Sequence, residues 1–153
     1  MKMNTKSQTI RTIPLLIVMV LINGCYSFDT SNEHPVTRIS VDSLIKTSQS
    51  WDSTELPSYP EGKPEITILR ITIPPRTKLP LHKHPVINAG VLLKGSLTVT
   101  TEENEVLHLR SGDSIVEVVD KWHYGENKNN NPAEIIVFYA GVKGKPITMK
   151  RTK

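Results

Sequence analysis

The chain has very little cysteine, since Cys25 is the only one among its 153 residues. No disulfide can therefore form within the chain, and a hydrophobic core must stabilise its fold. A chain of this length is large enough for one domain with such a core and too short for two ordinary domains. We therefore expect one folded domain.

The chain also lacks a long hydrophobic run. The most apolar segment, residues 13–22, is ten residues long, whereas a membrane-spanning helix needs about twenty. Basic residues precede this run, and the small or polar residues Asn23 and Gly24 follow it. This pattern excludes a transmembrane anchor and is typical of a cleaved secretion signal. We expect residues 1–24 to be a signal peptide.

The only cysteine lies where such a signal would be cut. Residues 22–25, Ile-Asn-Gly-Cys, resemble the lipobox of bacterial lipoproteins, in which the cysteine is lipidated and becomes the first mature residue. The resemblance implies a lipid anchor on Cys25. In a cell with two membranes, Tyr26 in place of an aspartate favours the outer membrane, facing the periplasm. Residues 25–37 are polar and suit a linker between lipid and domain. The alternative is an ordinary secreted protein with one free thiol.

The mature chain has almost no net charge. Removing Lys2, Lys6 and Arg11 with the signal leaves 16 basic and 15 acidic residues, a net charge of +1. This balance gives no support for binding to nucleic acid. The C-terminal stretch, residues 143–153, is locally basic. We expect it to be a solvated tail rather than a surface for phosphate head groups.

Strand and turn signals alternate along the rest of the chain at a spacing of about ten residues. The predicted strands cover residues 65–73, 79–84, 88–94, 96–101, 106–110, 114–119 and 133–140. The first carries β-branched residues on both faces and is predicted to be buried on both sides. The fourth alternates apolar and polar residues, which predicts one wet face. Such short strands indicate an all-β sandwich or barrel rather than a parallel sheet with crossover helices.

Three histidines are the main candidates for chemistry. His82 and His84 form a His-x-His pair. Side chains at positions i and i+2 of a strand point the same way, so both imidazoles can bind one ion. His123 supplies a third imidazole, and Asn127 follows it by four residues. We expect metal binding by the histidines and a turn fixed by the Asn127 side chain.

The histidines stand in register with two motifs of the cupin superfamily, which the chain resembles. The first motif is a glycine, five residues, His-x-His, three or four residues, a glutamate, six residues and a glycine. Here Arg76 takes the first glycine position, His82 and His84 match, Asn88 replaces the glutamate, and Gly95 matches. The substitution at Arg76 matters little if its turn avoids a left-handed conformation.

The second cupin motif is a glycine, five residues, a proline, one residue, a glycine, two residues, a histidine, three residues and an asparagine. Gly112, His123 and Asn127 fall in register, while Val118 and Asp120 take the proline and second glycine positions. A lone His-x-His would be weak evidence. Two motifs in register are strong evidence.

The resemblance implies an antiparallel double-stranded β-helix, the cupin or jelly-roll barrel, over residues 66–141 of a domain spanning residues 38–153. It also implies a divalent transition metal (Fe, Mn, Zn, Ni or Cu) in the barrel mouth. The usual site has three histidines and one carboxylate. Here His82, His84 and His123 would be the ligands, and the amide oxygen of Asn88 would be a weak ligand at best. The alternative is a barrel without metal.

Glu117 is a candidate for the missing acid. It interrupts the apolar run of residues 115–119, where a carboxylate is costly unless it is paired or exposed. If the side chain points into the barrel, it would serve as a fourth ligand or as a catalytic proton acceptor with a raised pKa. If it points outward, it is an ordinary edge charge. The sequence leaves both orientations open.

Three classes of function follow from this pattern. The first is a metal-dependent dioxygenase or isomerase with Glu117 as base. The second is a sensor or carrier that binds a small molecule in the barrel mouth without chemistry. The third is an interaction barrel, which the resemblance implies would be a homodimer, as many cupins are.

Overall fold

The computed structural model describes residues 38–152. The predicted signal peptide, linker and lipidation site at Cys25 lie outside them. The residues from Ser40 onward form one compact unit. Within the described residues there are ten strands and no helix. The described part of the chain therefore contains no helix that could cross a membrane. The strands are β1 (Pro64–Ile73), β2 (Thr77–Lys78), β3 (His82–Lys83), β4 (Ile87–Lys94), β5 (Ser96–Thr101), β6 (Val106–Arg110), β7 (Ser114–Val116), β8 (His123–Asn127), β9 (Ala133–Val142) and β10 (Met149–Lys150).

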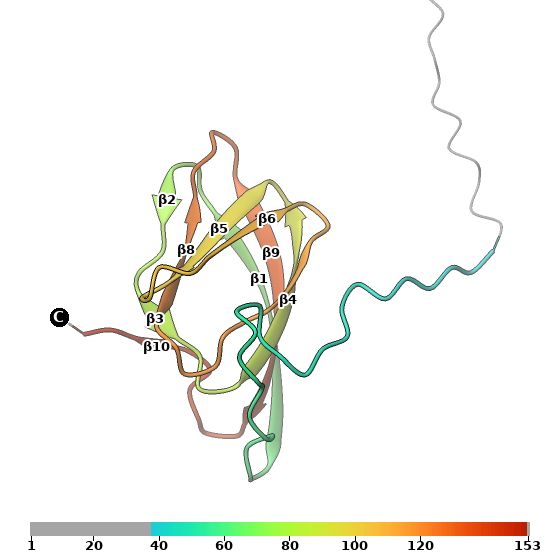
Figure 1. The fold of residues 1–153 in the computed structure, drawn as a ribbon. Coiled ribbons are helices and arrows are strands. Elements are labelled where there is room, and N and C mark those ends of the chain that lie inside the picture. The colour runs from blue at the N-terminus through green and yellow to red at the C-terminus, as the bar shows by residue number, and fades with distance from the viewer. Residues whose placement is uncertain (1–37, 153) are drawn as a thin grey trace, which may run out of the picture. The chain divides into compact units, whose positions relative to one another are not determined.

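The strands form two antiparallel sheets (Figure 1). The first sheet has the order β1-β9-β4-β7. The second has the order β10-β3-β8-β5-β6, with β2 paired to β8. Two facing antiparallel sheets around a shared core are the jelly-roll arrangement. The predicted fold class is confirmed.

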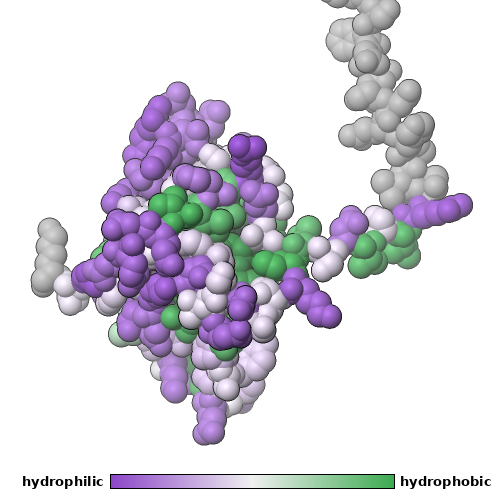
Figure 2. Space-filling view, viewed as in Figure 1, coloured by the Kyte–Doolittle hydropathy of each residue, from purple (hydrophilic) through white to green (hydrophobic). Residues whose placement is uncertain are grey.

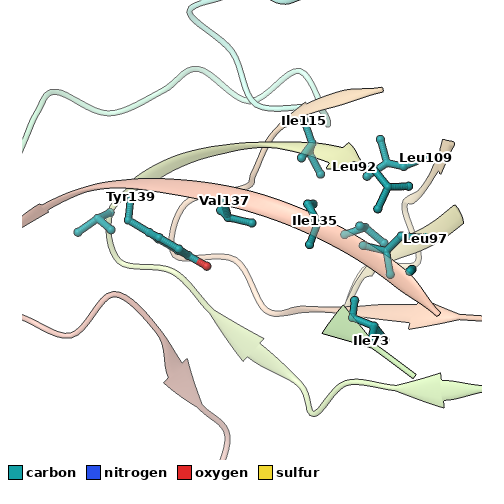
Figure 3. Close-up of a cluster of buried hydrophobic side chains, with 11 residues drawn as sticks. Ile73, Leu92, Leu97, Leu109, Ile115, Ile135, Val137 and Tyr139 are labelled. Atoms are coloured by element: carbon teal, nitrogen blue, oxygen red, sulfur yellow. The ribbon is translucent and has the colours of Figure 1, made fainter. Parts of the chain in front are cut away.

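The hydrophobic core draws on both sheets (Figure 3). Leu92 and Ile135 come from the first sheet, and Leu97 and Leu109 from the second. Each of these four side chains is at most 5% exposed. Burying a side chain of this kind contributes about 1.5–3 kcal/mol. This core holds the two sheets together. The polar side chains of the site lie in one part of the interior.

Four positions of the cupin motifs lie in the left-handed backbone region. Gly95 and Gly112, the two glycines that match the cupin motifs, have φ angles of 78° and 94°. Arg76 and Asp120 replace motif glycines and still have φ angles of 53° and 56°. A left-handed conformation costs about 1–2 kcal/mol for such residues. Contacts offset this cost, because the Arg76 guanidinium donates to Asn130 Oδ1 and the Asp120 N–H donates to the carbonyl of His84.

Two predictions of strand burial are wrong. Ile66 and Ile68 of β1 are 53% and 62% exposed, so one face of this edge strand is largely open to solvent. On β5, Thr98 and Thr100 are buried rather than wet. β5 lies between β6 and β8, so the neighbouring side chains cover both threonines, and Thr98 Oγ1 lies 3.1 Å from Nδ1 of His108.

The C-terminal stretch is not only a solvated tail. Met149 and Lys150 form β10, which pairs with β3 so that Lys150 lies opposite His82. The Arg151 guanidinium donates two hydrogen bonds to the carboxylate of Glu102. Two-residue strands carry no periodic signal, so the sequence could not reveal β10. This strand becomes part of the wall beside the histidines.

Asn127 fixes a turn, as predicted. Its side-chain amide donates to the carbonyls of Ile73, Pro74 and Asn131, and its Oδ1 accepts from the N–H of Asn129. The side chain is fully buried. Asn127 therefore ties the end of β8 to the end of β1 and to the start of β9.

Candidate metal centre

Strand pairing brings the three histidines together. His82 on β3 is the direct partner of His123 on β8, so their side chains lie on one face of the sheet. His84 follows β3 and bridges to Val119. The ring centroids lie 4.5–5.2 Å apart. The nitrogens of the three rings that could bind an ion lie within 4.8 Å of one another. The structure thus assembles the three residues that the sequence singled out.

Each imidazole is oriented by a main-chain carbonyl. The Nδ1 atoms of His82, His84 and His123 lie 2.7, 2.8 and 2.9 Å from the carbonyl oxygens of residues 80, 147 and 121. A carbonyl oxygen only accepts, so each Nδ1 carries the proton and each neutral ring keeps its lone pair on Nε2. Such outer hydrogen bonds are the usual support of metal-binding histidines.

Burial keeps the three rings neutral. It lowers the pKa of His82, of His123 and of His84, whose pKa falls to about 4. Hydrogen bonds to the carbonyls raise these pKa values, but by less than burial lowers them. A transition metal binds the neutral ring. The cluster is therefore in the protonation state for metal binding at neutral pH.

Glu117 points into the barrel. Its side chain is buried, and its Oε2 lies 3.3 Å from Nε2 of His123. Apart from this mutual approach, neither atom has a hydrogen-bond partner within the described part of the chain. Burial raises the pKa of Glu117 to about 7, although the nearby His82 lowers it. A buried carboxylate and a buried imidazole lone pair that face each other without a shared partner fit a bound cation.

Asn88 lies beside this cluster rather than within it. Its side chain is buried, and its Nδ2 donates weakly to the carbonyl of Val86 at 3.4 Å. The cavity between the histidines is lined by Glu117 and does not include Asn88. The N–H of Glu117 donates to the carbonyl of Asn88, so the two residues are neighbours across β4 and the end of β7. The carboxylate at the site thus comes from Glu117, which follows β7, the strand paired with the one that carries Asn88.

Tyr139 is a residue of the site that sequence reasoning missed. It is buried on β9, and its ring lies 5.3 Å from that of His84. Burial, and then the charge of Glu117, raise the pKa of Tyr139 to about 12, so its hydroxyl keeps its proton. The sequence did carry a signal for Tyr139. It alternates along one strand with Ile135 and Val137, which places all three side chains on the inner face.

The space around the cluster has two parts. An inner cavity of about 50 Å³ is lined by the histidines, Glu117, Tyr139 and apolar side chains of both sheets. A wider groove of about 250 Å³ shares His82, His84 and Tyr139 with it. The inner cavity holds little more than an ion and its waters. A larger molecule would have to lie in the groove.

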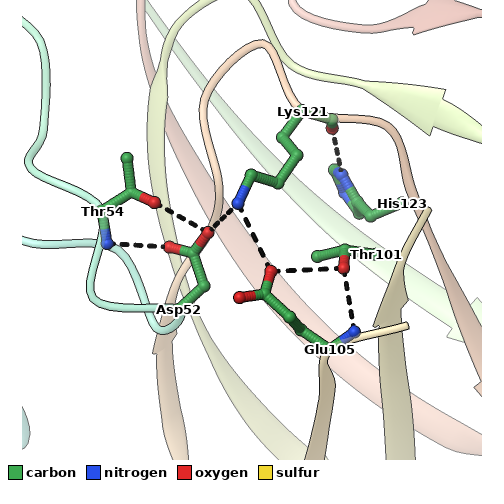
Figure 4. Close-up of polar contacts among 6 residues, drawn as sticks. All are labelled: Asp52, Thr54, Thr101, Glu105, Lys121 and His123. Atoms are coloured by element: carbon green, nitrogen blue, oxygen red, sulfur yellow. Dashed lines mark hydrogen bonds and ion pairs between the residues drawn. The ribbon is translucent and has the colours of Figure 1, made fainter. Parts of the chain in front are cut away.

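A second polar network supports His123 (Figure 4). Lys121, whose carbonyl accepts from His123, places its ammonium 2.5 Å from Oδ2 of Asp52 and 3.3 Å from Oε2 of Glu105. The Asp52 side chain is 0% exposed. Burial raises the pKa of Asp52, but hydrogen bonds from Lys121 and Thr54 outweigh it and hold the pKa below its usual value. This network joins the loop around Asp52 to the strand that carries His123.

Comparison with known proteins agrees with the topology. Residues 69–139 match the family model described as "Cupin domain". These residues have the cupin fold. The match supports assignment of the chain to the cupin superfamily. It covers all three histidines, Glu117 and Tyr139.

Several solved structures are similar to part of this chain. A structure from the work on the DMSP lyases RdDddP and RnDddQII is 13% identical, with a TM-score of 0.50 over 57% of this chain and 44% of that chain. The DMSP lyase DddQ from Ruegeria pomeroyi is 18% identical, with a TM-score of 0.49 over 56% of this chain and 42% of that chain. An RmlC-like cupin from Shewanella frigidimarina is 15% identical, with a TM-score of 0.45 over 52% of this chain and 69% of that chain.

This chain spans less than half the length of the two lyase chains. No curated protein matches it in sequence. The likeness at these identities concerns the fold alone.

Proposed function

We propose that this cupin binds one divalent transition metal through His82, His84 and His123, with Glu117 as the fourth ligand. The observation that carries the proposal is the meeting of three imidazoles within 4.8 Å of one another, beside a buried His123 Nε2 and a buried Glu117 Oε2 that face each other without another partner. Unpaired buried polar atoms cost free energy unless a cation binds them. Glu117 replaces the carboxylate that Asn88 does not supply.

The donor set suits a transition metal. Three imidazoles and one carboxylate are ligands that iron, manganese, zinc, nickel and copper all accept. One ionised carboxylate against a divalent ion leaves one net positive charge at the site. The ion would make bound water more acidic and attract an anionic ligand. The protein holds the imidazoles in one tautomer and restricts water to a small cavity.

Metal content tests this proposal directly. Protein purified without a histidine tag should contain, or take up, close to one equivalent of a transition metal. His82→Ala should abolish retention, whereas His108→Ala should not, because His108 lies on β6 and bonds to Thr98. Less than about a tenth of an equivalent, with no uptake of added metal, would exclude the site. Equal retention by the two variants would refute the assignment of the ligands.

Two classes of activity remain candidates for the metal-bound protein. One is a dioxygenase or isomerase, for which the inward-pointing Glu117 supports a role in proton transfer. The other is a carrier or sensor of a small ligand. If the metal is iron, oxygen uptake with diketones, phenols or thiols identifies a dioxygenase, since neither an isomerase nor a carrier would consume oxygen.

We also propose that a lipid on Cys25 anchors the domain to the outer membrane, with the domain facing the periplasm. The sequence pattern of residues 22–25 is the support for this proposal. Cys25→Ser should move the protein from the membrane fraction to the soluble fraction of the producing cells. A variant that stays with the membrane would refute lipidation.

A further inference from the structure

The groove beside the histidines is the approach to the proposed metal. Its walls include His82, His84 and Tyr139, which also line the inner cavity. A molecule in the groove can therefore reach the face of the cluster while its bulk remains outside the 50 Å³ cavity. At about 250 Å³ the groove equals roughly eight water volumes and is smaller than a drug-sized pocket. Its occupant must be a small molecule.

The lining of the groove combines two kinds of chemistry. Four of its lining residues are apolar: Leu69, Ile71, Leu79 and Pro80. Thr148 and Lys150 are polar residues of the same lining. Lys150 lies opposite His82 in the pairing of β10 with β3, and its positive charge acts on that ring. A ligand in the groove would therefore meet both hydrocarbon and a cation.

Lys150 is a cation without a partner at this end of the barrel. Its neighbours are paired: Lys83 with Asp120 at 3.1 Å, and Arg151 with Glu102. No carboxylate of the described residues forms an ion pair with Lys150. Its ammonium therefore adds to the positive charge that a divalent ion would leave at the histidines.

We propose that the groove binds a small aliphatic carboxylic acid in its ionised form. The carboxylate lies between Lys150 and the open positions of the metal, and the hydrocarbon part lies against Leu69, Leu79 and Pro80. The Tyr139 hydroxyl, which keeps its proton, is a donor on the same path, and Thr148 lines the groove beside it. This inference rests on the proposed metal site and specifies what that site recognises.

Isovalerate and its neutral isostere isovaleramide are the probes that test this inference. Isothermal titration of metal-loaded protein should show that isovalerate binds at least about tenfold more tightly than the amide, since tenfold corresponds to 1.4 kcal/mol. Lys150→Gln should weaken isovalerate about tenfold and leave the amide unchanged, and Lys150→Arg should restore most of the loss. Lys145→Gln is the matched control, because Lys145 is a nearby lysine that does not line this groove.

A second variant tests the apolar part of the lining. Leu69 is 37% exposed at the edge strand β1, so Leu69→Asn should fold. It should weaken isovalerate but not acetate, which lacks the branched chain. Equal effects on both acids would contradict the proposed orientation.

Metal content measured on the same samples separates the two proposals. Full metal content with no preference for isovalerate over the amide, or with unchanged binding by Lys150→Gln, overturns this inference and leaves the metal site intact. Protein that binds no metal overturns both.

Discussion

At the scale of single residues, Glu117 lies in surroundings that oppose its charge. In metal-free protein its pKa of about 7 stands above the ordinary value of 4.5. A carboxyl group whose pKa is higher in the folded state than in the unfolded state contributes its full stabilisation at pH values below the unfolded pKa. That contribution is lost as the pH rises from about 4.5 to above 7.

We expect this loss to appear as a difference between the wild type and Glu117→Gln, which cannot ionise. Relative to the variant, chelator-treated wild type should lose about 3 kcal/mol in free energy of unfolding between pH 4 and pH 8. Urea denaturation at both pH values measures it. The histidines titrate in both proteins, so their contribution to the free energy of unfolding, which increases with pH, cancels in the comparison. Parallel pH profiles would show that Glu117 is not buried in the barrel.

The sequence could name the histidines but not the orientation of Glu117. Two histidines separated by one residue share a face of any strand, so their meeting needed only local geometry. Around Glu117, residues 115–118 are all buried, because the N–H of Trp51 bonds to the carbonyl of Val116 and the loop covers that side. A strand covered on both faces shows no alternation, and alternation was the signal required.

At the scale of elements, the loop around Asp52 acts as a brace for the strand of His123. Asp52 is enclosed and bonded to Lys121, whose carbonyl orients His123 (Figure 4). Asp52→Asn should destabilise the fold by about 2 kcal/mol, since a buried charge-assisted hydrogen bond is lost. Amide exchange at Trp51 should become faster, because its N–H bonds to Val116 across the same junction.

The matched control for Asp52 is Glu105→Gln. Glu105 contacts the same ammonium but its side chain is 43% exposed. Exposed ion pairs contribute less than about 1 kcal/mol. Equal losses of unfolding free energy in the two variants would contradict the bracing role of Asp52.

Most of the longer strands were predicted and β3 lies within the predicted strand of residues 79–84, but β2, β8 and β10 were not predicted. Residues 96–101 and 106–110 were predicted with the bounds that β5 and β6 have. β2, β3 and β10 have two residues each, so long-range pairing alone defines them. Lys150 reaches the site through such pairing, so the sequence could not reveal it, whereas Tyr139 lies on β9, where alternation was a usable signal.

At the scale of the whole molecule, one outer face of the first sheet is apolar. Ile68 of β1 and Phe138 of β9 are direct partners and are 62% and 43% exposed. Ile66 continues the same face and is 53% exposed. Figure 2 shows apolar patches among the polar surface of one side of the molecule. Contiguous exposed apolar surface often marks an interaction site.

We expect a second copy of the chain to cover this face. Light scattering after gel filtration should give the mass of a homodimer for the wild type. Phe138→Lys should give a monomer with full metal content. Val106→Lys, at an equally exposed position on β6 of the other sheet, should leave the dimer intact. A wild type that is monomeric at every concentration would refute the expectation.

The carbonyl groups that orient the three imidazoles have a consequence for how this barrel can diverge. They belong to residues 80, 121 and 147, and any amino acid at those positions supplies a carbonyl. Mutation of the surrounding side chains therefore leaves the tautomers unchanged so long as the backbone keeps its path. Descendants of this sequence can exchange the groove residues for a different ligand while they inherit the same arrangement of nitrogens.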